Sequence, residues 1–137
     1  MKRYYLDTAI WIDYYENRAD RFRPLGEWAL ALLKKISEKK EAILFSDVIY
    51  GEMFVFGYTE EEIENLLHPW TDLIQKITPT RQEIAEAIME SKKRKLPYGD
   101  CLHAILSRDH DALLIARDHH FESLIDIKKC QKPEELI

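Results

Sequence analysis

Apolar residues in this chain fall into short continuous runs, separated by longer segments with helical spacing. The runs at 3–6, 42–45 and 112–116 are bounded by polar residues, as is typical of short strands buried on both faces of a sheet. Two further runs, at 73–77 and 125–127, are interrupted by polar residues. They predict additional short strands, the second of them at an edge of the sheet.

The segments between these runs predict helices. The clearest has apolar residues three and four positions apart, on one helical face: Leu25, Trp28, Ala29, Leu32, Leu33 and Ile36. Others are predicted at 10–16, after Ser46 or Asp47, at 59–68, after Thr80 and from Asp100, with a helical turn from Pro133. Strands that alternate with helices favour the α/β class. We therefore expect one domain over 1–137, with a central parallel sheet in a three-layer α/β/α arrangement.

Four carboxylates stand where such a sheet would gather them. Asp7 comes directly after a predicted strand and Asp118 lies just beyond another. Asp100 opens a predicted helix, and Glu52 lies within another helix. The functional crevice of an open parallel sheet lies outside the carboxyl ends of its strands. Two carboxylates ~4 Å apart repel by about 4 kcal/mol at an effective dielectric of 20. Since a divalent cation would relieve this repulsion, the pattern favours metal-dependent chemistry on a phosphate ester.

Glu52 carries the strongest signal of the four. It falls on an apolar helical stripe formed by Val48, Ile49, Val55 and Phe56, which predicts an inward-facing position. A buried glutamate needs compensation. Either a basic side chain pairs with it, or it positions a metal ion or water.

The other three acids each have a structural alternative. Asp7 and Asp100 are suited to capping helices, and Asp118 to capping a turn that leads to Phe121. Thr8 could orient the neighbouring carboxylate or cap the next helix. Position alone leaves these alternatives open.

Composition narrows the function classes only slightly. The 137 residues carry 25 acidic and 20 basic side chains, a net charge of −5, which argues against a module that coats nucleic acid but not against a nuclease. Two cysteines make no disulfide framework. No segment reaches the ~20 apolar residues of a membrane span, and the N-terminal residues do not resemble a signal peptide. We expect a cytoplasmic protein.

Several other side chains are candidates for chemistry or binding. Arg117 could contact RNA phosphate, and Tyr98 could stack on a base, although surface pairing and core packing are the common alternatives. His119 and His120 could bind phosphate or a softer metal, or form a solvated turn. His103, one helical turn after Asp100, could join it at a metal or hydrogen-bond locally.

Two other enzyme classes place an aspartate after the first strand. The haloacid-dehalogenase-like phosphatases have a second aspartate two positions later, where this chain has Ala9. A receiver domain has a lysine after a late strand, and no such lysine is evident. Both are disfavoured.

Four motifs, taken in order, resemble the PIN-domain ribonucleases, most closely the small VapC-type toxins of toxin–antitoxin pairs. They are Tyr5-Leu6-Asp7-Thr8, Glu52 within a helix, Asp100-Cys101-Leu102-His103-Ala104, and Leu114-Ile115-Ala116-Arg117-Asp118-His119-His120-Phe121. The resemblance implies an endoribonuclease dependent on Mg²⁺ or Mn²⁺, with Asp7 and Asp100 as the principal metal ligands. By the same likeness, Glu52 and Asp118 would bind a second ion or position water.

The resemblance also implies partners. It predicts a homodimer, an RNA substrate and a small antitoxin protein whose tail blocks the crevice. The chain departs from the family pattern at Ala116, where many members have Thr or Ser, and at His120, where many have a further Asp or Asn. A degenerate PIN-like scaffold that binds RNA or a protein without cleavage is the alternative.

Overall fold

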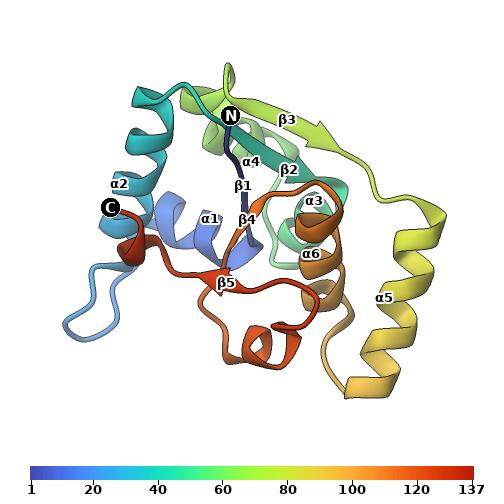
Figure 1. Ribbon diagram of the computed structural model, residues 1–137. Helices are drawn as coiled ribbons and strands as arrows, with labels where there is room; N and C mark the ends of the chain where they lie inside the picture. The colour runs from blue at the N-terminus through green and yellow to red at the C-terminus, as the bar shows by residue number, and fades with distance from the viewer.

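A five-stranded sheet forms the centre of the computed structural model, which describes residues 1–137 (Figure 1). The strands are β1 (Arg3–Leu6), β2 (Ala42–Ser46), β3 (Ile74–Ile77), β4 (Leu113–Ile115) and β5 (Cys130–Gln131). Their spatial order is β3-β2-β1-β4-β5, and every neighbouring pair is parallel. This confirms the predicted parallel sheet.

Helices cover both faces of the sheet. They are α1 (Thr8–Glu16), α2 (Leu25–Glu38), α3 (Asp47–Val55), α4 (Glu60–Leu67), α5 (Arg81–Arg94) and α6 (Tyr98–Asp109), with short 3₁₀ helices η1 (His68–Trp70), η2 (His119–Leu124) and η3 (Pro133–Glu135). Helix α1 packs on α2, and α5 packs on α6. Figure 1 shows the first pair on one side of the strands and the second pair on the other, which is the expected three-layer arrangement.

The central strands are apolar on both faces because helices pack against both. Tyr5 of β1 pairs with Leu44 of β2 and Leu114 of β4, and all three side chains are buried. Strand β3 lies at the edge of the sheet, and its Gln75 and Lys76 are exposed. The edge position explains the polar residues that interrupt this run.

Two helix starts follow directly from capping chemistry. Capping boxes form at Thr59, whose partner is Glu62, and at Thr80, whose partner is Glu83. The turn predicted from Pro133 is present as η3.

One predicted strand was wrong. Residues 125–127 do not form the edge strand; Ile125 is 56% exposed, and the amide of Ile127 bonds to the carbonyl of Leu124. The edge strand is β5, which pairs with β4 in parallel. Because a parallel return requires a crossover, the chain must first pass through η2, and the strand begins only at Cys130.

No helix in the structure combines the length and apolar character needed to cross a membrane.

Candidate active site

The order of the strands places β1 and β4 side by side at the point where the chain direction across the sheet reverses. Strands β2 and β3 follow on one side, and β5 on the other. Ligand sites in open α/β sheets lie at such a switch point, outside the carboxyl ends of the strands. Asp7 follows the last residue of β1, and Asp118 lies three positions after β4. The predicted strand-end acids are therefore at this edge.

Asp7 is the most deeply buried carboxylate of the group, at 4% exposure. It is the N-cap of α1, and its Oδ1 accepts a hydrogen bond from the amide of Ile10 at 3.2 Å. Burial raises the pKa of Asp7 to about 7, against the opposing effect of His103, and the nearby carboxylates of Asp100 and Glu52 add to the rise. Asp7 thus caps α1 and also lies near the other acids of the site.

Asp100 lies in the first turn of α6, but it does not begin the helix. The helix starts at Tyr98, and Pro97 occupies the N-cap position. Burial raises the pKa of Asp100, His103 opposes the rise, and the charge of Asp118 adds to it. Asp100 therefore lies close enough to His103 and Asp118 for their charges to affect its pKa.

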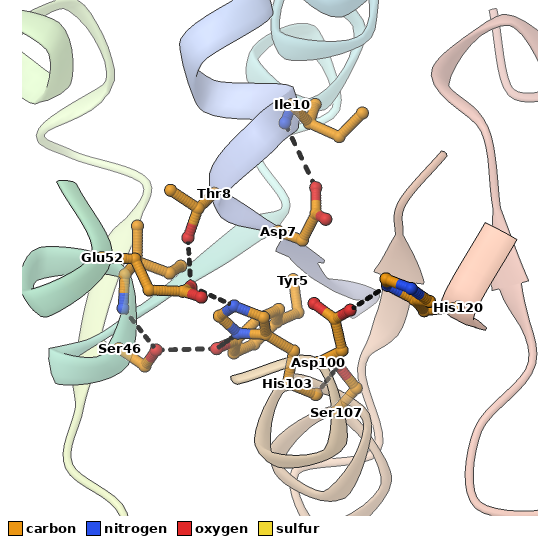
Figure 2. A network of polar contacts seen from close by, with 11 residues as sticks. Tyr5, Asp7, Thr8, Ile10, Ser46, Glu52, Asp100, His103, Ser107 and His120 are labelled. Atoms are coloured by element: carbon orange, nitrogen blue, oxygen red, sulfur yellow. Dashed lines mark hydrogen bonds and ion pairs between the residues drawn. The ribbon is translucent and has the colours of Figure 1, made fainter. Parts of the chain in front are cut away.

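Glu52 is held by two donors that converge on one oxygen. Thr8 Oγ1 donates to Glu52 Oε1 at 2.6 Å, and His103 Nε2 lies 2.5 Å from the same atom (Figure 2). Burial alone would raise the pKa of Glu52, but the contacts with His103 and Thr8 outweigh it and hold the pKa below its usual value. Thr8 thus orients Glu52, not the adjacent Asp7.

The apolar stripe predicted around Glu52 was wrong in part. Ile49 and Met53 are the buried residues of α3, whereas Val55 is 85% exposed and Phe56 is 66% exposed. The helix ends at Val55, so the stripe has no further turn on which to continue. Glu52 lies beside the inward face and is partly exposed.

His103, predicted either to join Asp100 at a metal or to hydrogen-bond locally, contacts Glu52 and Tyr5, and the part of Tyr5 was not predicted. Both side chains are almost fully buried, and Tyr5 Oη lies 2.6 Å from His103 Nδ1. Burial opposes protonation of His103, but Glu52, Asp7 and Asp100 together raise its pKa. For Tyr5, the only sequence signal was a polar group within an otherwise apolar strand.

On the other side of Asp100, His120 bridges two acids. Its Nδ1 is 3.0 Å from Asp100 Oδ2 and 3.2 Å from Asp118 Oδ1 (Figure 2 shows the first contact). Asp118 caps η2 by accepting from the amide of His120 at 2.9 Å. His119 Nδ1 lies 3.3 Å from Asp118 Oδ1, although this imidazole is 81% exposed. All three residues of this run therefore turn ligand atoms towards one another.

Comparison with known proteins identifies the family. The PIN domain family model matches residues 4–126. The chain belongs to the PIN domain family. No curated protein matches it by sequence.

Solved structures share the PIN fold over nearly the whole chain. VapBC2 from Rickettsia felis bound to a DNA fragment from its promoter has 17% sequence identity, with a TM-score of 0.68, and the match covers 95% of this chain and 98% of that one. VapBC-1 from nontypeable Haemophilus influenzae has 20% identity and a TM-score of 0.62, covering 96% and 98%. A toxin–antitoxin complex from Klebsiella pneumoniae has 21% identity and a TM-score of 0.61, covering 95% and 97%.

The side chains of this PIN domain fit a divalent cation. Carboxylate oxygens are the ligands that Mg²⁺ and Mn²⁺ prefer, and imidazole nitrogen suits the softer transition ions. The ligand atoms of Asp118, His119 and His120 all lie within 4.8 Å of one another. A buried carboxylate such as Asp7 needs compensation, which a cation would supply.

The two residues predicted to contact substrate differ in their surroundings. Tyr98 is 39% exposed and lines a cavity of about 580 Å³ beside Glu52. Arg117 forms two bonds of 2.7 Å to Glu134 and lies over the ring of Trp28. Tyr98 is therefore free to meet a ligand, whereas Arg117 already has an anionic partner.

Proposed function

We propose that this PIN domain is an endoribonuclease that hydrolyses RNA phosphodiester bonds with Mg²⁺ or Mn²⁺, as the toxin of a toxin–antitoxin pair. One observation carries the proposal. Four acids from separate elements, Asp7, Glu52, Asp100 and Asp118, gather at the carboxyl edge of the sheet, and burial raises the pKa of the first to about 7. Such a group is costly without a cation and useful with one.

The residues divide into roles by burial and contact. Asp7 and Asp100 would be the principal metal ligands, because each is substantially buried and has a raised pKa. Glu52 and Asp118 would bind a second ion or orient the attacking water. A bound cation would supply an activated water and neutralise charge on the scissile phosphate.

The RNA itself must be held by other groups, because the chain has a net charge of −5. Tyr98 stands two residues before Asp100 at the mouth of the cavity, where its exposed ring can stack on a base. We propose single-stranded RNA as substrate, since stacking requires an unpaired base.

The same surface supports protein partners. The cavity beside Glu52 is lined by apolar side chains, including Val48, Ile84 and Leu102, and Asp47 adds a second acid. An antitoxin segment with apolar residues and one basic residue would complement it. The solved structures named above are of toxin–antitoxin complexes, which agrees with this assignment.

A homodimer would cover a different apolar surface. Ile88 and Met89 of α5 are 44% and 58% exposed, and a second copy of the chain would bury them. Light scattering should give twice the monomer mass of 16.3 kDa, and Ile88→Asp should reduce it to the monomer value.

Cleavage of a single-stranded RNA panel tests the nuclease proposal. Purified protein should cut with Mg²⁺ or Mn²⁺ and not with EDTA, and Asp7→Asn should abolish cutting without unfolding the chain. No cleavage with any ion, together with retained RNA or antitoxin binding, would favour the degenerate scaffold.

A further inference from the structure

A buried series of hydrogen bonds leads from β2 to Glu52 and has no part in the function proposed so far. Ser46 Oγ lies 2.7 Å from Tyr5 Oη, which lies 2.6 Å from His103 Nδ1. His103 Nε2 then contacts Glu52 Oε1 at 2.5 Å (Figure 2). The side chains of Ser46, Tyr5 and His103 are buried from solvent to within 1%.

The direction of hydrogen-bond donation along this series is fixed at Glu52. An ionised carboxylate can only accept, so His103 must donate its Nε2–H to Glu52 whatever the charge on the ring. With a neutral ring, Tyr5 donates to Nδ1 and Ser46 donates to Tyr5. Ser46 in turn accepts the amide of Ile49 at 3.4 Å. Every polar group then has a partner, so the ring has one orientation with all its bonds made.

The second oxygen of Glu52 is confined by a different residue. A Cβ built at Gly99 would overlap Glu52 Oε2 and stand 3.2 Å from its Cδ. Gly99 lies within α6, where backbone geometry does not require glycine, since its φ is not positive. The missing side chain therefore makes room for the Glu52 carboxylate.

Together these contacts form a clamp that holds both carboxylate oxygens of the flexible Glu52 side chain. Thr8 and His103 hold Oε1, and the backbone at Gly99 borders Oε2. We propose that Tyr5, His103 and Gly99 are positioning residues that set the Glu52 carboxylate for its role at the metal-dependent site. This inference rests on the proposed function, because it concerns how Glu52 performs it. Catalytic side chains need placement within about 0.5 Å, which a surface glutamate does not have by itself.

Gly99→Ala tests the clamp without removing a hydrogen bond. Alanine favours helix over glycine, so the fold should be at least as stable, while the added methyl group displaces Glu52. We expect kcat to fall about tenfold or more, with KM for RNA changed less than twofold. Glu52→Ala provides the control background, because the added methyl group then has no carboxylate to displace, and Gly99→Ala should change cleavage less than twofold there. Cleavage by Gly99→Ala equal to that of the unsubstituted protein would overturn the role of Gly99.

Tyr5→Phe tests the other end of the clamp. It should lower kcat about tenfold, as loss of an outer partner of a metal ligand does. Tyr4→Phe is its control, because this buried tyrosine of the same strand donates to Glu41 at 3.0 Å, outside the site. In a Glu52→Ala background, Tyr5→Phe should change cleavage less than twofold. An undiminished effect there would mean that Tyr5 does not act through Glu52, and would overturn the proposal.

A measurement without RNA or metal separates this inference from the nuclease proposal. ¹⁵N-edited NMR should show His103 protonated at Nε2, with slow exchange of that proton, in the unsubstituted protein and in Tyr4→Phe. The signal should shift or exchange faster in Tyr5→Phe and Gly99→Ala. A signal that is absent from the unsubstituted protein, or unchanged in both variants, contradicts the clamp. If the signals behave as expected and no ion supports cleavage, the clamp stands and the nuclease proposal fails.

Discussion

The two halves of the candidate site differ in how firmly their acids are held. Glu52 has two donors on one oxygen, and the imidazole that supplies one of them is buried and bonded at its other nitrogen. Asp118 is the N-cap of the 3₁₀ helix η2, its side chain is 43% exposed, and its neighbour His119 is 81% exposed. The hydrogen bonds that hold Glu52 are therefore all formed within the protein itself. The Asp118 half has carboxylate and imidazole ligand atoms that are exposed to solvent, and an ion or substrate can reach them.

Asp100 belongs to both halves, so its loss should have the largest effect. It contacts His120 and lies within electrostatic reach of His103. Asp100→Asn should lower metal-dependent cleavage by about 10³-fold or more, some 4 kcal/mol in the barrier. Single-turnover kinetics on the cleaved RNA measures this. Asp109→Asn on the surface of the same helix should leave cleavage nearly unchanged, and a similar loss in both would point to a fault in the helix.

In the absence of metal, the pH dependence of the free energy of unfolding should report on the buried Asp7 and His103. Because Asp7 has a pKa of about 7 when folded and 3.8 as its ordinary value, the folded chain retains a proton that the unfolded chain releases between these values. Stability should therefore fall as pH rises from about 4 to 7, by roughly 3 to 4 kcal/mol for a shift of this size. The raised pKa of His103 acts in the same direction, since its stabilisation is lost as pH rises through the folded value.

Denaturant unfolding in EDTA at a series of pH values provides the measurement. Asp7→Asn should flatten the curve and be more stable than the parent at pH 8. Saturating Mn²⁺ should restore stability to the parent at pH 8, by about 2.7 kcal/mol at one hundred times the dissociation constant, and much less to Asp7→Asn. A parent protein whose stability is level from pH 4 to 7 would contradict the burial of a charged Asp7.

The difference between the halves also explains what could be predicted from sequence. Asp7 was placed correctly because a strand end is a local pattern, and Glu52 was singled out because a carboxylate within an apolar helix is conspicuous. Its partner His103 is 51 positions away, and Tyr5 is 98 positions from His103. No spacing rule connects them, because the sheet and α6 create the contact. The misplaced edge strand at 125–127 failed for a similar reason, since the crossover length is set by the path around β4.

The residues of the Asp118 half should determine which metal ion the site prefers. His120 supplies a nitrogen beside two carboxylates, whereas many PIN domains have Asp or Asn at this position. His120→Asn should weaken Mn²⁺ binding about tenfold while changing Mg²⁺ binding less, because imidazole favours transition ions. Calorimetric titration of the RNA-free protein measures both. His68→Asn, an exposed histidine in η1, is the control. Equal weakening for the two ions would mean that His120 orients the acids without binding metal.

The smallest effect is expected at Arg117, which links the Asp118 half to the C-terminal segment. Arg117 precedes Asp118, is only 14% exposed, and bonds to Glu134 through both terminal nitrogens at 2.7 Å. Arg117→Ala should lower the free energy of unfolding by about 1 to 2 kcal/mol, with KM for RNA changed less than threefold. Arg108→Ala removes a pair of the same geometry, formed with Glu86 and 37% exposed, and should cost less because solvent screens it. A tenfold rise in KM at unchanged stability would instead make Arg117 a phosphate contact. Glu134 would then be the group that RNA displaces from Arg117.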